Sequence, residues 1–408
     1  MIGSIVFDGG LMDFGFSDEQ ELFRRTIREG LSTHLTPRLR EMEENREIPR
    51  EAIREMAKMG LLGITVSEEF GGMHADFVTS TIAAEEIGRA DITLATAVYF
   101  LLEAGWGYIF DKYGQQEAKA EVLPHVTSGE YFLGVASTEP SGGSDVAGEK
   151  TLARRVDDKY VVNGEKTYIS GVGEAHKYGG GFLLFTKTNP ELGHKGMTII
   201  YTPVRDTPGV SVSLIRNMGR EGISTGIITL REAELPLKYR VGEENSGFYY
   251  AMEGFNNARI LVSAATIGAA QRVLEMGVDY IKNREVFGQK LSKFQGVQFQ
   301  LAEHYAKLEA ARALVYKAAW MTDEYYRSSR FSRSEVVKSV SAVKWLGPTF
   351  AFDAIRDVAT WFGAYGYSKY SLIEASVRGA FSYLMGAEGA LNVMKQLLAR
   401  EILGRDYA

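Results

Sequence analysis

The chain has 408 residues, of which 45% are hydrophobic and 24% charged, a composition typical of a globular protein with two or three packed regions. It contains no cysteine, which excludes disulfides, a thiolate nucleophile and a zinc site built on cysteine, and is compatible with an intracellular location. The 46 basic and 52 acidic residues give a net charge of −6, which argues against a nucleic-acid-binding surface, and the six scattered histidines lack HxxH spacing, so we expect no metal site.

Residues 12–130 are expected to form an N-terminal α-helical domain, preceded by an extension of residues 1–11. Ser17 and Gln20 have the spacing of a capping box, and apolar residues after them, such as Ile27 and Leu31, recur on one helical face. The first eleven residues have no basic start, so the sequence predicts no signal peptide.

The segment from Ile92 to Phe110 is similar in length and character to a membrane span, because its nineteen residues carry a single charge. Glu103 and two glycines interrupt it, and acidic residues flank both of its ends. We therefore expect a buried helix or pocket wall, with a membrane-spanning helix as the alternative.

Residues 131–247 are expected to form a middle β domain, either a β-sandwich or a barrel-like sheet. Short apolar runs alternate here with turn signals, and Asn163-Gly164 is typical of a hairpin turn. Residues 248–408 return to long amphipathic stretches, of which Phe299–Trp320 is the clearest, and predict a C-terminal four-helix bundle. The predicted fold class is therefore α+β, with mostly α structure.

Two short motifs carry the candidate chemistry. The stretch from Ala136 to Gly148 reads ASTEPSGGSDVAG, in which glycines permit close approach of the backbone to a ligand. Near the C-terminus, Glu388 stands beside Gly389 just ahead of a helical apolar pattern, where burial raises the pKa of a carboxyl and makes it a usable base. The alternative is an ordinary acid at a helix N-terminus, favoured by the helix dipole.

Together these motifs resemble those of the acyl-CoA dehydrogenase flavoenzymes. TEPSGGSD (138–145) is similar to the family's signature, and Glu388-Gly389 matches its catalytic Glu-Gly pair, at the same distance from a final Ala399-Arg400. Further similar motifs follow in family order over nearly the whole chain, namely EEFGG (Glu68–Gly72), EEIGRA (Glu85–Ala90), NGEKTYIS (Asn163–Ser170), REVFGQKLSKFQ (Arg284–Gln295) and FGAYGY (Phe362–Tyr367).

The resemblance implies an enzyme that removes hydrogen from the α and β carbons of an acyl-CoA thioester to give the trans-2-enoyl-CoA. Glu388 is then the base and FAD the hydride acceptor, bound between the β domain and the C-terminal bundle. Some relatives carry their base on an earlier helix, immediately before an arginine, but that position is Ala258 here, before Arg259. Glu388 is therefore the sole base at a family position.

The same matching implies the residues that bind each ligand. Those at flavin-contacting positions are Val135, Ser137, Thr138, Ser144, Tyr168, Ser170, Arg284, Phe287, Gln295, Thr360, Gly363, Ala364, Ala390 and Asn392. Of these, Arg284, Phe287 and Gln295 match residues that reach the FAD of a neighbouring subunit. Those at substrate positions are Ser144, Tyr99, Phe255, Asn256, Arg259 and Gly389, with an ordinary exposed helix face as the alternative for Asn256 and Arg259.

The chain departs from the family pattern around the catalytic pair. The segment from Tyr367 to Glu388 differs by about one residue in length from common relatives, which leaves the local register open. Ala387 stands where relatives have a bulky tyrosine. Together with Tyr99, Phe100 and Tyr365, this small residue suggests a pocket reshaped for a branched, cyclic or aromatic acyl group.

The resemblance also implies partners. We expect acyl-CoA as the substrate, an electron-transfer flavoprotein as the electron acceptor, and a homotetramer built as a dimer of dimers, without nucleic acid or membrane. The expected location is the cytoplasm, or the mitochondrial matrix in a eukaryote. Two alternatives stay open: an acyl-CoA oxidase or flavin monooxygenase on the same fold, and a non-enzymatic flavin-bearing protein that binds nucleic acid.

Overall fold

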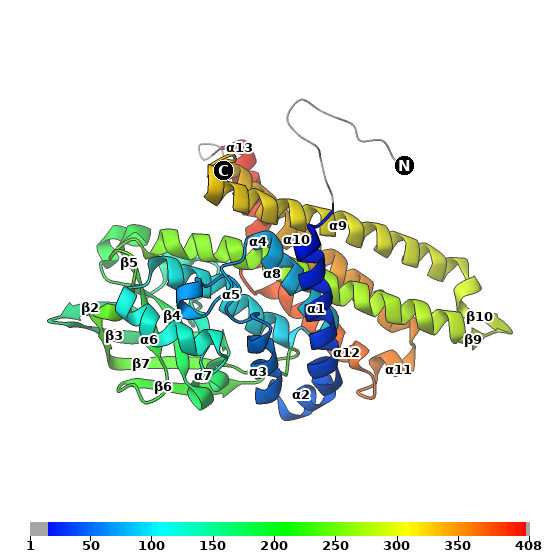
Figure 1. The fold of residues 1–408 in the computed structure, drawn as a ribbon, viewed down its shortest axis with the longest axis horizontal. Coiled ribbons are helices and arrows are strands. Elements are labelled where there is room, and N and C mark those ends of the chain that lie inside the picture. Colours follow the sequence, from blue (N-terminus) through cyan, green and yellow to red (C-terminus); the bar gives the residue numbers. More distant parts are fainter. Residues whose placement is uncertain (1–14, 405–408) are drawn as a thin grey trace.

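The computed structural model describes residues 15–404, and their N-terminal part is helical, as expected (Figure 1). The predicted capping box is present, because the Ser17 hydroxyl accepts the backbone N–H of Gln20 and the Gln20 side chain accepts that of Ser17. The predicted extension, residues 1–11, lies outside the described residues. The helices of this part are α1 (Asp18–His34), α2 (Leu39–Asn45), α3 (Arg50–Lys58), α4 (Phe77–Ala90), α5 (Ala95–Tyr113) and α6 (Gln116–Thr127).

Helix α5 is buried along nearly its whole length. The buried carboxylate of Asp91 accepts the backbone N–H groups of Thr93 and Thr96, and so satisfies donors at the start of the helix. The prediction of a buried helix for Ile92–Phe110 is therefore confirmed. No helix among residues 15–404 combines the length and the hydropathy needed to cross a membrane.

The middle part is an open sheet of eight strands. The strands are β1 (Phe132–Ala136), β2 (Leu152–Val156), β3 (Lys159–Ser170), β4 (Gly180–Lys187), β5 (Met197–Pro203), β6 (Val210–Ile215), β7 (Thr225–Pro236) and β8 (Arg240–Val241). Their order is β6-β7-β3-β2-β4-β5-β8, and β1 pairs in parallel with β4. The predicted β domain is confirmed, but the sheet does not close on itself, so the barrel-like alternative does not hold.

The dipeptide Asn163-Gly164 is not a hairpin turn, contrary to the prediction. It lies inside β3, opposite β7, where the pairing register shifts as at a β-bulge. The Asn163 side chain joins the two strands, because its Oδ1 accepts the backbone N–H of Glu232 at 2.8 Å. The turn of the hairpin is instead Asp157-Asp158, between β2 and β3.

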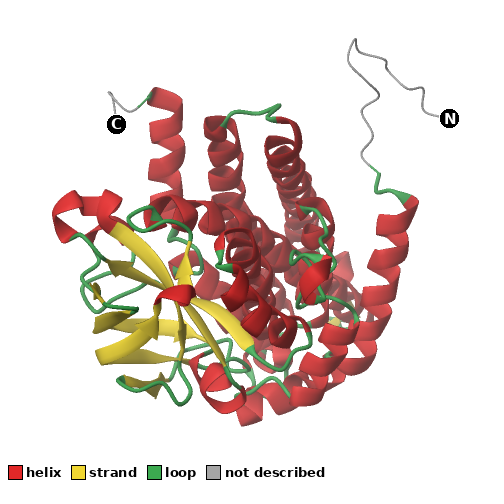
Figure 2. Cartoon of the chain, turned by 60° about the vertical axis from the view of Figure 1, so that its left-hand side comes forward, coloured by secondary structure: helices red, strands yellow, loops and turns green. Residues whose placement is uncertain are grey.

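Three long helices form the body of the C-terminal part: α8 (Gly247–Asn283), α9 (Gln295–Ser328) and α10 (Arg333–Trp361). The shorter elements are β9 (Glu285–Val286), β10 (Gln289–Lys290), α11 (Ala364–Tyr367), α12 (Leu372–Met385) and α13 (Leu391–Leu403). Helix α10 packs against α8, α9, α12 and α13 and is the centre of the predicted bundle. Figure 2 shows the sheet standing beside the helices rather than among them.

Helices α4 and α8 approach each other closely, because a glycine of each faces the partner's backbone. A Cβ on Gly88 of α4 would lie 1.9 Å from the carbonyl oxygen of Ala265, and one on Gly268 of α8 would lie 2.1 Å from that of Glu85. Backbone atoms in a packed core cannot move aside without displacing their helix. The glycine pair therefore fixes the position of α8, the helix that carries Arg259.

We predict that Gly268→Ala lowers the free energy of unfolding by about 1–3 kcal/mol, the usual cost of overpacking a core. Denaturant titration followed by circular dichroism measures this change. The matched control is Gly296→Ala near the start of α9, where an added Cβ meets nothing within 4 Å. That variant should match or exceed the wild-type stability, because alanine has the higher helix propensity. Equal stability of the two variants would contradict the close α4–α8 contact.

Candidate active site

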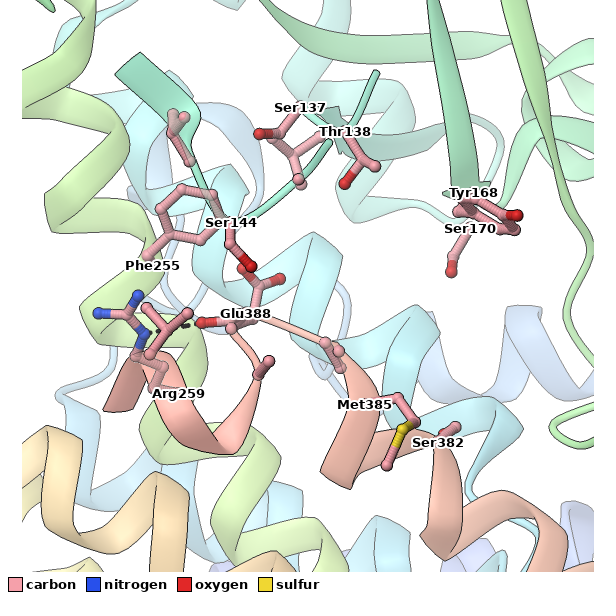
Figure 3. Close-up of a pocket in the computed structure, with 18 of the residues that line it drawn as sticks. Ser137, Thr138, Ser144, Tyr168, Ser170, Phe255, Arg259, Ser382, Met385 and Glu388 are labelled. Atoms are coloured by element: carbon pink, nitrogen blue, oxygen red, sulfur yellow. Dashed lines mark hydrogen bonds between the residues drawn. The ribbon is translucent and has the colours of Figure 1, made fainter. Parts of the chain in front are cut away.

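A cavity of about 850 Å³ lies where the loops of the sheet meet α5, α8 and the turn between α12 and α13 (Figure 3). Most of the predicted site residues come together in its wall, although they are spread over more than 250 positions of the sequence. Those that line it are Val135, Ser137, Thr138, Ser144, Tyr168, Ser170, Phe255, Arg259, Glu388, Gly389 and Ala390.

Glu388 lies in a turn whose backbone is left-handed at three successive residues. The φ angles are 51° at Ala387, 69° at Glu388 and 127° at Gly389. Two of these residues carry a Cβ, and such residues rarely adopt positive φ unless the surrounding structure holds them there. At the third position the φ of 127° favours glycine, whereas an added Cβ would meet only the flexible end of Met394, with Cε at 2.8 Å.

Arg259 of α8 holds this turn from the opposite side of the cavity wall. Its Nε donates to the backbone carbonyl of Glu388 at 2.8 Å (Figure 3). Its Nη1 donates to Oδ1 of Asn256 at 3.0 Å. Arg259 is 5% exposed, and burial lowers the pKa of its guanidinium to about 10. The exposed helix face considered for Arg259 is therefore wrong, and Asn256 orients the guanidinium that holds the turn.

The carboxylate of Glu388 is largely shielded from water and incompletely paired, although the residue as a whole is half-buried and lines the cavity. Oε1 accepts a long hydrogen bond of 3.4 Å from the indole N–H of Trp106 on α5, and Oε2 is shielded from solvent without a hydrogen-bond partner among residues 15–404. Burial raises the pKa of this carboxyl to about 7, against the smaller lowering effects of Trp106, Arg259 and Lys344. Among residues 15–404 the carboxylate is hydrogen-bonded to an indole of α5 and not to the backbone N–H groups at the start of α13. This disfavours the alternative of an ordinary acid that interacts with the dipole of that helix.

The opposite wall of the cavity fits a flavin ring. It presents the hydroxyls of Ser137, Thr138 and Ser170, together with the ring of Tyr168, which is 65% exposed and has a φ of 57° (Figure 3). A planar heterocycle placed here would cover the tyrosine ring, and the hydroxyls could serve its ring nitrogens and carbonyls without adding charge. The residues present therefore fit the isoalloxazine part of FAD.

A buried ion cluster holds the loop that carries these hydroxyls. Lys166 of β3 is fully buried, and its Nζ donates to Oε1 of Glu139 at 2.9 Å, to Glu149 at 2.5 Å and to the carbonyl of Ser137 at 3.1 Å. Glu139 in turn accepts the backbone N–H groups of two residues beyond the loop. The glutamate of the TEPSGGSD motif thus has a structural task, which is to close this loop onto the sheet.

Three predicted residues near the cavity do not line it, namely Tyr99, Asn256 and Asn392. Tyr99 is buried against Phe132, with ring centroids 5.1 Å apart, because Val98, Leu101 and Leu102 occupy the face of α5 that is turned to the cavity. The structure therefore does not bring Tyr99 to the predicted substrate site. Asn392, in the first turn of α13, is likewise absent from the cavity wall.

The remaining predicted flavin residues lie far from the cavity, toward the ends of α8 and α10. Two of them follow the last turn of α8, one begins α9, one lies in the last turn of α10 and two come directly after α10. Phe287 is 95% exposed at a φ of 49°. None of them lines the cavity of the same chain. This set consists of Arg284, Phe287, Gln295, Thr360, Gly363 and Ala364.

The sequence did not reveal several residues that shape the site. Trp106 contacts the carboxylate from α5, and Arg220, Arg378 and Met385 line the cavity from other elements. Lys344 of α10 is fully buried and lies behind the turn. For Lys344 a signal was present, since a single lysine within the apolar helical run SVSAVKWLG has no obvious route to solvent.

Comparison with known proteins agrees with the fold and the site. Models of the acyl-CoA dehydrogenase N-terminal, middle and C-terminal domains match residues 17–130, 134–233 and 245–403. An acyl-CoA dehydrogenase of Bacillus subtilis (strain 168) is 32% identical over 95% of this chain and 99% of its own length.

Solved structures agree as well. The structure of the glutaryl-coenzyme A dehydrogenase glutaryl-CoA complex superposes with a TM-score of 0.89 at 28% identity, covering 96% of this chain and 97% of that chain. A structure from work on the electron transferring flavoprotein of Acidaminococcus fermentans superposes with a TM-score of 0.86 at 29% identity. The match covers 96% of this chain and 100% of that chain. The chain belongs to the acyl-CoA dehydrogenase family, and it is an FAD-dependent oxidoreductase.

The raised pKa of Glu388 predicts a pH-dependent cost to stability. Below the unfolded pKa of about 4.3 both states hold the proton and the cost is absent; it grows as the pH rises toward about 7 and is constant above. Glu388→Gln removes this cost, so at pH 8 the variant should be more stable than the wild type by as much as about 3 kcal/mol.

Thermal or chemical unfolding of both proteins between pH 5 and pH 8 measures the difference. It should shrink to less than about 1 kcal/mol as the pH approaches the pKa of a free carboxyl. A difference that is the same at both ends of the range would show that Glu388 is not buried as an acid with a raised pKa.

Proposed function

We propose that Glu388 is the base of an α,β-dehydrogenation of acyl-CoA, the reaction to which family membership assigns the chain. The observation that supports this role most is the shielded Oε2, which has no hydrogen-bond partner in the part of the chain that the structure describes and belongs to a carboxyl whose pKa is about 7. A base with a pKa near the working pH combines a large ionised fraction with adequate strength. When bound, FAD supplies the acceptor for the hydride that leaves the β-carbon.

The backbone around Glu388 supports the same role. The backbone N–H of Glu388 donates no hydrogen bond among residues 15–404, so it is available to the carbonyl oxygen of a thioester. A fixed N–H donor stabilises the negative charge that develops on that oxygen when the α-proton leaves. Arg259 holds the carbonyl of Glu388, and the positive φ of Gly389 continues the turn that carries this N–H and the carboxylate.

The acyl group is proposed to lie along α5. Val98, Leu101 and Leu102 supply an apolar floor to the cavity, and burial of a hydrocarbon chain there excludes water from the carboxylate. Of the residues that suggested a reshaped pocket, Ala387 lines the cavity, whereas Tyr99, Phe100 and Tyr365 do not. We therefore retain only the proposal that the small side chain of Ala387 leaves extra room in the cavity. This room favours an acyl group that is bulky near its thioester.

We predict that Glu388→Gln binds FAD normally but reduces it at least about 10²-fold more slowly, the usual contribution of a general base. Anaerobic mixing with a panel of straight, branched and aromatic acyl-CoAs, followed by loss of flavin absorbance, measures the rate. Glu130→Gln is the matched control, because it removes an exposed carboxylate far from the cavity. Wild-type rates in Glu388→Gln would assign the base to another residue.

Electrons are proposed to leave through an electron-transfer flavoprotein. The likeness to the Acidaminococcus fermentans structure supports a partner of this kind. The oxidase or monooxygenase alternative predicts peroxide or a hydroxylated product under air, at the rate of substrate consumption.

We also propose that the chain divides into domains at residues 12–130, 131–247 and 248–408, since α6 ends at Thr127 and α8 begins at Gly247.

The assembly is proposed to be a homotetramer in which each FAD is completed by a neighbouring subunit. Large aromatic side chains stand exposed near the ends of α8 and α9 and around α11: Phe287 is 95%, Tyr367 90% and Tyr370 80% exposed. Exposed aromatic groups of this size are typical of a surface that another chain covers. The predicted residues Arg284, Phe287 and Gln295 lie at this end of the chain.

We predict that Arg284→Ala loses FAD at least about 10-fold more readily, because a charge-assisted contact to a phosphate contributes about 1.5–3 kcal/mol. Dialysis against FAD-free buffer with absorbance at the flavin band measures the loss, and light scattering reports the mass of the assembly. Lys282→Ala, two residues earlier on α8, is the control for removing a cation from this region. Tight FAD binding by a monomeric Arg284→Ala protein would contradict the shared site.

A further inference from the structure

Lys344 of α10 points its ammonium group at the end of α12, immediately before the turn that carries Glu388. Its Nζ donates to the carbonyl oxygen of Tyr383 at 2.9 Å and to that of Gly386 at 3.4 Å. Both carbonyls belong to the C-terminal end of α12, where no further helical N–H is available to them. Lys344 therefore acts as a side-chain cap on this helix.

The burial of Lys344 is complete, since its exposed fraction is 0%. No carboxylate forms an ion pair with it among residues 15–404, and the charged groups nearest to it are Arg259 of α8 and Glu388 itself. Burial, with a further contribution from Arg259, lowers the pKa of the ammonium to about 7, while Glu388 raises it. Burying an ammonium group costs free energy, and two carbonyls and a distant carboxylate offset only part of that cost. A lysine at this position is therefore expected to have a function.

The geometry of the turn at residues 386–389 indicates what this function is. Two buried cations hold it from two helices, because Lys344 fixes the last carbonyls of α12 and Arg259 fixes the carbonyl of Glu388. Between these two anchors stand Ala387 and Glu388, both at positive φ, a conformation that persists only when neighbours impose it. If the end of α12 moved, the carboxylate of Glu388 would move with it.

We infer that Lys344 is a positioning residue for the reaction: it sets the place of the Glu388 carboxylate by capping α12, and its charge favours the ionised form of that carboxylate. This inference rests on the proposed role of Glu388 as the base. Lys344 does not line the cavity wall, so its effect on the reaction is exerted through the position and the ionisation of Glu388.

The test compares Lys344→Met, which keeps the length of the side chain without its charge or donors, with Lys344→Gln, which keeps a donor without the charge. Flavin reduction is followed anaerobically across pH 5 to pH 9, with the acyl-CoA that reduces the wild-type flavin fastest in the panel. We expect Lys344→Met to lower the limiting rate about 10- to 100-fold, as a displacement of about 1 Å in a reacting group does, with KM little changed.

The pH profile separates positioning from general loss of structure. Removing a positive charge near Glu388 raises the pKa of its carboxyl, so the midpoint of the rate should move to higher pH in both variants. Lys344→Gln should recover part of the rate through its donor but keep the shifted midpoint. Crystal structures of the variants should show the turn at residues 386–389 displaced in Lys344→Met and closer to its original place in Lys344→Gln.

Asp323→Ala is the control for stability. Asp323 of α9 accepts the backbone N–H groups of Phe77 and Val78 at the start of α4, away from the cavity, so its loss should lower the melting temperature without moving the pH midpoint. Should Lys344→Met fail to fold, Lys344→Gln carries the comparison. A wild-type rate and midpoint in the folded lysine variants, or the same midpoint shift in Asp323→Ala, would overturn the inference.

Glu388→Gln, measured in parallel, distinguishes this failure from failure of the proposed function. If Glu388→Gln still reduces the flavin, Glu388 is not the base, whatever the lysine variants do. If Glu388→Gln is inactive while the lysine variants match the wild type, the base assignment stands and the positioning role of Lys344 falls.

Discussion

The active site depends on one constraint, which is that the carboxylate of Glu388 is held where solvent scarcely reaches it. Burial of Glu388 costs free energy because one of its oxygens has no partner among residues 15–404 and the other has only the long bond to Trp106. The same burial gives the carboxyl a pKa near 7 and so makes it useful as a base. Burial of Glu388 therefore lowers stability while it raises reactivity. Interactions elsewhere in the protein offset the lost stability.

Each part of the chain contributes a separate share of that support. Helix α5 brings the apolar floor and Trp106, α8 brings Arg259, and α10 brings Lys344 from behind the turn. The sheet holds the facing wall, where the Lys166 cluster fixes the loop of hydroxyls. The glycine contact between α4 and α8 keeps α8 at the distance that Arg259 needs, so a packing feature remote from the cavity bears on its geometry.

Much of the fold and part of the site could be predicted from the sequence, since periodicity and caps are local signals. The order of helix, sheet and helix and the capping box at Ser17 were accessible in this way, whereas the role of Glu388 followed from the resemblance of its motif to a known family. Asn163-Gly164 was misread because pairing with β7 overrides its preference for a turn. Trp106 and Lys344 could not be assigned, because their partners lie 282 and 39 positions away and only tertiary packing joins them.

The most direct measurement is the rate of flavin reduction by an acyl-CoA in the wild-type protein, recorded in a single anaerobic turnover from pH 5 to pH 9. A buried base with a pKa near 7 must lose its proton before it can act. The rate should therefore rise with pH and level off above a midpoint close to 7. A rate that is already maximal at pH 5, as for an ordinary exposed carboxylate, would contradict the account.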